Sequence, residues 1–281
     1  MDLPHIDAGV AQQIGGRRLR GQEIDAARDE TVAEEIAVGF VYNGFPHAVM
    51  MATPNDLVDF AAGFSLTEGL IDGLAGLRGV AASADTDGIR LAIELAPAAL
   101  TSFLQRRRVR QLRGHTSCGI CGVEEIAQVA QLAARAPQSF SAATRPRLDA
   151  APLRRALAAL RDYQPLSRVT RCAHAAAWSD PHGRLVLVRE DVGRHNALDK
   201  LIGGGLRASV DTSDGFCLVT SRCSYEMVQK AIMARMPMLV AISAPTALAI
   251  RTARQAGLTL ATFDRDGEPV VYSAGDWGDA R

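Results

Sequence analysis

The stretch Phe216–Ser243, which reads FCLVTSRCSYEMVQKAIMARMPMLVAIS, decides the fold class of this chain. Its two ends, Phe216–Thr220 and Met238–Ser243, are short apolar runs of the length that buried strands have. Between them, Ser224–Met236 repeats apolar residues at helical spacing. A buried strand, a helix and another buried strand in succession indicate an α/β unit whose strands run parallel.

The same alternation continues on both sides of this unit. Further strands are predicted at Leu185–Arg189 and Leu258–Phe263, with an added edge strand at Val270–Tyr272. Helices are predicted at Leu153–Leu160, at Asn196–Ile202 with a cap at Gly203–Gly205, and at Pro245–Gln255. Residues 150–281 are therefore expected to form an α/β domain with a mostly parallel sheet.

The first half of the chain follows a different pattern. Strands are predicted on each side of Asn43-Gly44, a dipeptide typical of tight hairpins, and a second hairpin is predicted around Asp87-Gly88. A helix is expected after Thr53 as its N-cap, and another over Pro97–Arg113. This predicts a smaller α+β domain over residues 24–149, preceded by a loose tail over residues 1–23.

Composition narrows the class of protein. The chain has 281 residues, 48% hydrophobic and 22% charged, with a formal net charge of zero. This balance gives no reason to expect a nucleic-acid or membrane partner. No apolar run is long enough to cross a bilayer, the N-terminus does not resemble a signal peptide, and five cysteines do not suggest a disulfide framework. We therefore expect a cytoplasmic protein.

Cys118-Gly119-Ile120-Cys121-Gly122 is the most reactive feature of the sequence. Glycines leave the backbone free to turn sharply, and the preceding segment carries several arginines. Apolar spacing after Gly122 predicts that a helix begins there. Positive charge and a helix N-terminus both lower the pKa of a thiol, so this pair is a candidate nucleophilic site.

Three interpretations of this loop remain open. A dithiol redox site or sulfur carrier uses both thiols directly. A structural zinc knuckle needs four ligands, and the sequence has no second Cys-x-x-Cys, so Cys172 and His174 would have to complete the set. Inert buried cysteines are a third interpretation, but a glycine-rich polar loop is a poor core.

Polar residues follow each predicted strand of the second half. The segments are Glu190–Asn196, Ser221–Ser224, Ser243–Thr246 and Asp264–Gly267. In α/β sheets ligands bind beyond the carboxyl ends of the strands. Helix N-termini there offer free amides, and Arg194, Arg222 and Arg265 suit phosphate oxygens. These loops fit either a phosphate-bearing ligand such as a nucleotide or polar loop ends without a ligand, which are common in α/β sheets. The spacing of His195 with Asp199, and of Asn196 with Lys200, fits either local helix contacts or a ligand-facing first turn.

Several long motifs resemble one known family, the formate dehydrogenase accessory sulfurtransferases called FdhD/NarQ. The motifs are Phe60–Ile71, Cys118–Gly122, Arg189–Lys200, Ser221–Lys230 and Val240–Pro245. Two departures stand out. Thr170 is followed by Arg171-Cys172-Ala173-His174, where the family usually has Thr-Gly-Gly, and the segment after Phe263 is more acidic than in many relatives.

The resemblance implies a fold and a chemistry. It implies a homodimer whose C-terminal domain is three-layered and cytidine-deaminase-like, without the zinc site. It implies a sulfurtransferase and cofactor chaperone that takes persulfide sulfur from a cysteine desulfurase. The sulfur then passes to a molybdenum or tungsten bis(molybdopterin guanine dinucleotide) cofactor needed by the formate dehydrogenase catalytic subunit. The alternatives are a thiol–disulfide oxidoreductase or a zinc-knuckle binding protein.

The resemblance also assigns residues. Cys118 would carry the persulfide and Cys121 would assist, and no metal-binding residue is expected. The cofactor would contact the segment after the last long strand, namely Phe263, Asp264, Arg265, Asp266, Gly267 and Glu268. Arg194, His195, Asn196 and Arg222 are the further cofactor-binding candidates, because their loops lie at the same expected edge and suit the guanine nucleotide moiety and its phosphates.

Overall fold

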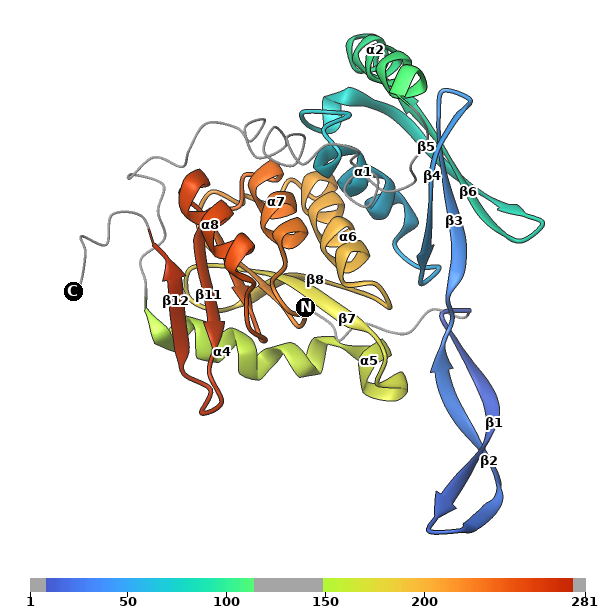
Figure 1. Cartoon of the computed structure of the whole chain (residues 1–281), viewed down its shortest axis with the longest axis vertical. Coiled ribbons are helices and arrows are strands. Elements are labelled where there is room, and N and C mark those ends of the chain that lie inside the picture. The colour runs from blue at the N-terminus through green and yellow to red at the C-terminus, as the bar shows by residue number, and fades with distance from the viewer. Residues whose placement is uncertain (1–8, 114–148, 275–281) are drawn as a thin grey trace.

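The computed structural model describes residues 9–113 and 149–274, except for the side chains of 108–113. Its centre is a six-stranded sheet with the order β12-β11-β10-β9-β7-β8. The strands are β7 His174–Ser179, β8 Leu185–Asp191, β9 Phe216–Val219, β10 Met238–Ala241, β11 Thr259–Phe263 and β12 Pro269–Ser273. Helices lie on both faces of this sheet (Figure 1). The α/β class expected for the second half is confirmed.

The sheet is less parallel than the sequence suggested. β9 pairs in parallel with β10, and β10 with β11, but β7 is antiparallel to both β8 and β9. The edge strand β12 is also antiparallel to its neighbour β11. The expectation of a mostly parallel sheet is therefore confirmed in part: four of the six strands share one direction, but only two of the five neighbouring pairs are parallel. A short turn between β7 and β8 includes Gly183 at φ 84°, and such a turn can join only antiparallel strands.

Alternating strand residues supply two hydrophobic cores. Ala177, Leu218 and Val240 face α4 (Ala150–Leu160), whereas the neighbouring residues Cys217 and Leu239 belong to the core on the opposite face. That opposite face is covered by α6 Arg194–Arg207, α7 Tyr225–Met233 and α8 Ala247–Ala256. The second half is therefore layered as helix, sheet and helices (Figure 1).

The first half forms its own four-stranded sheet, with the order β4-β3-β6-β5. The strands are β3 Ile36–Tyr42, β4 Phe45–Ala52, β5 Leu77–Asp85 and β6 Gly88–Leu95. Both predicted hairpins are confirmed. Asn43 and Gly44 turn between the first two strands with φ of 46° and 84°, the positive values that a tight hairpin needs. The helix predicted over Pro97–Arg113 is α2, and no helix of the described ranges is long and apolar enough to cross a membrane.

Two helices join the halves by an unusually close crossing. α1 (Leu57–Thr67) lies against α6 (Figure 1). A Cβ placed on Gly63 would lie 1.8 Å from the Asp199 carbonyl oxygen, and one on Gly203 would lie 1.8 Å from that of Asp59. The prediction that Gly203–Gly205 caps a helix is therefore wrong. α6 continues to Arg207, and its glycines allow the backbones to approach.

The predicted start of the first helix is also wrong, for a reason that concerns the site. α1 begins at Leu57 after Asp56, so Thr53 does not cap it. Instead the Thr53 backbone N–H donates to the Asp191 carboxylate at 3.1 Å, and the Thr53 hydroxyl accepts from the Val192 N–H at 3.1 Å. Thr53 therefore binds the loop after β8, from more than a hundred positions away in the chain.

The expectation of a loose tail over residues 1–23 is wrong for Ala11–Arg20. This segment is β1, which pairs with β2 (Glu23–Ala33) as a two-stranded antiparallel ribbon that projects from the body (Figure 1). Gly21 turns the chain at φ 61°, and Arg20 pairs with Asp25 at 3.2 Å. The polar, glycine-containing sequence suggested disorder, but opposite charges across the turn suit a hairpin.

Candidate functional site

The carboxyl ends of β8, β9, β10 and β11 meet at one edge of the central sheet. β7 is antiparallel to both β8 and β9, so these two strands point the same way, and β9, β10 and β11 are parallel. The first residue of β7, His174, pairs with the last residue of β8, Asp191, and so lies at this edge too. The structure therefore places all four predicted ligand loops along one side of the sheet, as expected for a doubly covered α/β sheet.

Two of the helices that start at this edge have open N-termini. α6 begins after Gly193 and α7 after Ser224, and neither cap residue gives a side-chain hydrogen bond to the first turn. α8 differs, because the Thr246 hydroxyl accepts from the Ala249 N–H at 3.2 Å. The first-turn amides of α6 are consequently without a side-chain cap, which is the arrangement that binds phosphate oxygens. In α7 the Glu226 carboxylate lies in the first turn and accepts a backbone hydrogen bond there, so this end is less suited to an anion.

Arg194 and His195 carry buried nitrogen atoms that lack partners. Arg194 Nε and His195 Nε2 are both shielded from solvent and make no hydrogen bond within the described ranges. A buried polar atom without a partner costs free energy, so such atoms are uncommon unless a ligand satisfies them. Both residues lie in the first turn of α6, beside its open N-terminus.

Electrostatics keep His195 neutral. Burial, together with the charges of Arg194 and Lys230, lowers the pKa of His195 to about 4. Burial and Arg194 likewise lower the pKa of His174, at the start of β7. Glu226 in the first turn of α7 opposes the effect on His195, but does not reverse it. A neutral imidazole at neutral pH offers a ligand one donor and one acceptor without adding charge.

Asn196 occupies a structural position in the same turn. Its side chain is buried, and its amide nitrogen donates to the Met51 carbonyl at 2.8 Å and to Asp191 at 3.0 Å. Arg222, by contrast, is exposed on the loop before α7. Of the four candidates in these two loops, Asn196 fixes the loop, whereas Arg194, His195 and Arg222 retain groups that a ligand can reach or satisfy.

The turn after β11 lies at the other end of this edge. Asp264 organises the turn by accepting from the backbone N–H groups of Asp266 and Glu268, each at 2.9 Å, and Gly267 adopts φ 80°. Arg154 pairs with Glu268 at 2.6 Å. The Phe263 side chain belongs to the hydrophobic core under α4, while Arg265 and Asp266 are exposed. The side chains free to contact a ligand here are therefore those of Arg265 and Asp266.

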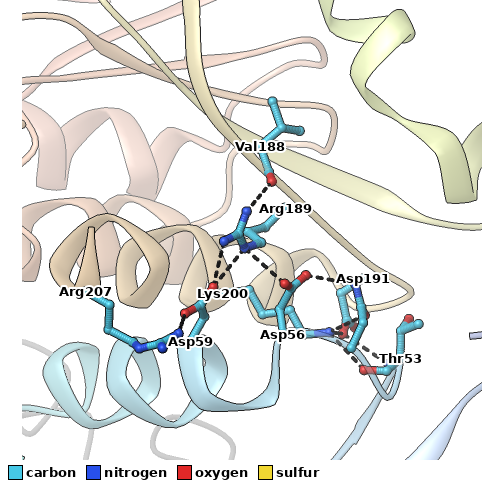
Figure 2. A network of polar contacts seen from close by, with 9 residues as sticks. Thr53, Asp56, Asp59, Val188, Arg189, Asp191, Lys200 and Arg207 are labelled. Atoms are coloured by element: carbon cyan, nitrogen blue, oxygen red, sulfur yellow. Dashed lines mark hydrogen bonds and ion pairs between the residues drawn. The ribbon is translucent and has the colours of Figure 1, made fainter. Parts of the chain in front are cut away.

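A buried ionic network positions the loop after β8 (Figure 2). The Lys200 ammonium group lies 2.7 Å from Asp191, and both side chains are fully buried. Lys200 also donates to the Thr53 carbonyl and to Asn55, each at 2.9 Å. This lysine therefore ties the end of β8 and helix α6 to the segment that precedes α1.

Further along the same network, Arg189 on β8 binds two acidic residues at the start of α1. It donates to Asp59 at 2.8 and 2.9 Å and lies 3.3 Å from Asp56, as Figure 2 shows. Arg207 at the end of α6 also pairs with Asp59. These ion pairs therefore hold β8 and the carboxyl end of α6 against the start of α1.

Neither pair of residues four apart forms the helix contact that their spacing allows. Asp199 binds the Thr67 hydroxyl at 2.7 Å and the Lys230 ammonium at 2.8 Å, and Lys200 binds Asp191. These partners come from other elements, so spacing along one helix could not identify them. The position of His174 beside His195 could not be predicted from the sequence for a related reason. It depends on the register between β7 and β8.

Among the described residues, two thiols are buried and therefore poor nucleophiles, and a third is exposed. Burial raises the pKa of Cys223 to about 12 and raises that of Cys217 further, and neither side chain is exposed. Cys172 is exposed on the segment before β7. Cys118 and Cys121, the predicted carrier thiols, lie outside the described residues. Within residues 9–113 and 149–274, no group of three or more His, Cys, Asp or Glu side chains is arranged to hold a metal ion.

Comparisons with known proteins identify the family. A model of the FdhD/NarQ family matches residues 33–276. The chain belongs to the FdhD/NarQ family. The resemblance seen in its motifs is thereby confirmed.

Relatives in the FdhD/NarQ family extend over almost the whole chain. One from Xanthomonas euvesicatoria pv. vesicatoria, named sulfur carrier protein FdhD, is 52% identical over 257 residues, which are 92% of this chain and 88% of that protein. A relative of the same name from Variovorax paradoxus is 44% identical over 97% of this chain and 94% of its own length.

A solved structure from Desulfotalea psychrophila, described as a candidate formate dehydrogenase accessory protein, shares the fold. Its TM-score is 0.72 at 22% identity, over 95% of this chain and 98% of that one. The FdhD/NarQ chain described here therefore has a mixed α/β fold that is already represented among solved structures.

Proposed function

We propose that this FdhD/NarQ protein is a sulfur carrier that collects persulfide sulfur on its Cys118–Cys121 loop. It then delivers the sulfur to a large nucleotide-bearing cofactor at the edge of its central sheet. The donor is a cysteine desulfurase, and the acceptor is a molybdenum or tungsten bis(molybdopterin guanine dinucleotide) that formate dehydrogenase requires. The carrier role rests on the name that the close relatives share and on the paired thiols.

The unsatisfied first turn of α6 is the observation that carries the acceptor site. Arg194 Nε and His195 Nε2 are buried without partners in the described ranges, next to a helix N-terminus without a side-chain cap. A phosphate group bound there would accept from the backbone amides and from arginine at the same time. Because His195 is neutral, it does not repel Arg194, and both side chains can contact the same guanine nucleotide.

The two candidate cofactor-binding clusters, the first turn of α6 and the turn after β11, lie at opposite ends of one edge, which favours a long ligand. β8 and β11 are separated by four strand spacings in the order β11-β10-β9-β7-β8, or about 19 Å at the usual spacing of roughly 4.8 Å. A mononucleotide would reach one end of this edge. A cofactor with a guanine nucleotide at each end could reach both, either within one chain or across the two chains of a homodimer.

The proposed transfer balances in atoms and electrons. A thiolate of Cys118 attacks the outer sulfur of the donor persulfide, the donor S–S bond breaks, and the desulfurase thiolate leaves. Attack by the Cys121 thiolate on the inner sulfur of the new persulfide then releases the outer sulfur as sulfide. A Cys118–Cys121 disulfide remains, which a thiol reductant reopens. The second thiol therefore supplies the electrons that convert persulfide sulfur to sulfide.

Intact mass measurement tests the carrier role. The protein is incubated with a cysteine desulfurase and cysteine, as wild type, as Cys118→Ala and as Cys121→Ala. We expect a gain of one sulfur atom that reductant reverses, and its loss in the variant that lacks the carrying thiol. Cys172→Ala is the control, because it removes an exposed thiol outside the loop.

Two results would contradict the carrier role. Absence of the adduct together with stoichiometric tightly bound zinc would favour a zinc knuckle. Turnover of protein disulfides without a sulfur adduct would favour a thiol–disulfide oxidoreductase.

A further inference from the structure

A polar pocket on the other side of the central sheet has no place in the proposed sulfur transfer. It is lined by Arg161, Gln164, Ser167, Arg168 and Arg171, and its volume is about 320 Å³. These residues come from the turn η3 (Arg161–Tyr163), from helix α5 (Pro165–Thr170), and from the residues immediately before and after α5. Figure 1 shows α5 at the end of α4, on the sheet face opposite α6–α8.

The pocket contains three guanidinium groups and no carboxylate. Within the described residues, none of Arg161, Arg168 and Arg171 forms a side-chain hydrogen bond or an ion pair. Other arginines of the same half do pair, as Arg154 does with Glu268 and Arg184 with Asp180. Three like charges around one concavity repel each other, so an anion placed between them would relieve the repulsion.

A buried acid behind α5 offsets the charge of this pocket only in part. Glu190 on β8 accepts from the backbone N–H groups of Leu166 at 2.9 Å and Ser167 at 2.8 Å, and it is only 6% exposed. Its oxygens are directed at the first turn of α5, and it is not among the residues that line the pocket. The carboxylate therefore fixes the helix that carries Ser167 and Arg168. It also attracts the Arg168 guanidinium, which opposes the rise that burial causes in the pKa of Glu190, but no ion pair forms between them within the described residues.

Arg171 occupies a backbone conformation that favours glycine. It ends α5 in the left-handed region, with φ 60° and ψ 15°. An arginine there is less favourable than glycine would be. The conformation turns the chain from α5 towards β7 and brings a third guanidinium group to the pocket.

We propose that this pocket binds a diphosphate group. Guanidinium forks match phosphate oxygens in pairs, and three of them balance more negative charge than one carboxylate carries. Gln164 and Ser167 add neutral donors between the arginines. The volume lies at the small end of the range for ligand pockets, which suits a diphosphate more than a whole dinucleotide. None of the five residues that line this pocket is a cofactor-binding candidate at the edge of the sheet, so the proposal does not depend on the proposed sulfur transfer.

Calorimetric titration with inorganic pyrophosphate at constant ionic strength tests the site. The full chain is compared with Arg168→Ala/Arg171→Ala, in an Arg194→Ala/Arg222→Ala background so that the edge of the sheet does not contribute. We expect the affinity to fall at least about tenfold, because charge-assisted hydrogen bonds are lost. Arg168→Lys/Arg171→Lys should recover only part of the affinity, because lysine keeps the charge but not the fork.

Arg78→Ala/Arg251→Ala is the matched control, since both arginines are exposed and lie away from the pocket. An equal fall in this control would mean a general charge effect and would overturn the proposal, as would a starting protein that binds no pyrophosphate. Titration with GDP identifies the source of the diphosphate. A parallel loss of GDP affinity in the pocket variant supports a nucleotide diphosphate, and a loss confined to pyrophosphate supports the inorganic ion.

Discussion

The middle and the first turn of helix α6 differ in how their polar groups are satisfied. In the middle, Asp199 and Lys200 are fully buried, and each binds an oppositely charged partner within 2.8 Å. In the first turn, Arg194 Nε and His195 Nε2 are buried without a partner in the described ranges, and the helix has no side-chain cap. The two regions are only about one helical turn apart.

This difference separates structural from ligand-binding residues. Paired buried charges hold β8, α6 and the segment before α1 in one arrangement, and removal of one partner leaves the other uncompensated. Unsatisfied buried groups lower stability until a ligand meets them. Substitutions in the middle should therefore destabilise the fold, whereas substitutions in the first turn should affect binding.

Lys200→Met should give the largest effect. It leaves the Asp191 carboxylate buried without its cation, which typically costs about 3–5 kcal/mol of unfolding free energy. The measurement is chemical denaturation followed by circular dichroism. The double variant Asp191→Asn/Lys200→Met should lose less than Lys200→Met alone, because no uncompensated charge remains. If the double variant lost the sum of the two single losses, the ion pair would not be the cause.

Gly203→Ala should give the next largest effect. A Cβ there would lie 1.8 Å from the Asp59 carbonyl oxygen, so the two helices must move apart, at a cost of about 1–3 kcal/mol or more. Gly205→Ala in the same helix is the control, since its nearest neighbour is Val210 Cβ at 4.0 Å. Alanine at that position should stabilise the helix by up to about 1 kcal/mol. If thermal unfolding showed equal losses of stability in the two variants, the close-crossing explanation would be contradicted.

The sequence predicted some of these elements and not others. Local patterns identified the α/β class, both hairpins of the first half and α2, because strand length, Asn-Gly turns and helical spacing are local signals. The same signals failed at Gly203–Gly205, where three glycines resemble a helix end. The role of Gly203 depends on α1, which lies about 140 positions away in the chain.

The candidate site was predictable to a similar extent. The loops after the strands were placed correctly at one edge, because the direction of the strands determines where they end. The pairing of Lys200 with Asp191 and the place of His174 beside His195 were missed. Both depend on contacts across the sheet and between the two halves, which no spacing within one helix reveals.

His195 should make stability depend on pH. Its folded pKa is about 4 because of burial and nearby positive charge, whereas an unfolded histidine titrates near 6.5. Between these values the unfolded chain binds a proton that the folded chain does not, so stability falls as pH falls from about 6.5 to about 4. The loss attributable to this residue is about 1–3 kcal/mol.

Unfolding free energies of wild type and His195→Gln over this pH range measure the effect. The variant should show a shallower slope, with a residual slope from His174, whose pKa is also lowered. His182→Gln is the control, because His182 is exposed, and it should keep the wild-type slope. A His195→Gln protein with the full slope would show that this imidazole is not forced to stay neutral.

Arg194→Ala should change stability least and binding most clearly. The side chain has no ion pair in the described part of the chain and its buried Nε has no partner, so we expect stability within about 0.5 kcal/mol of wild type. Affinity for GDP should fall about tenfold, because an arginine–phosphate contact at a helix N-terminus is lost. Isothermal titration measures this, with Arg235→Ala, on the segment after α7, as the control. A large loss of stability with unchanged GDP affinity would make Arg194 a structural residue like Lys200, and the distinction between the first turn and the middle of α6 would then fail.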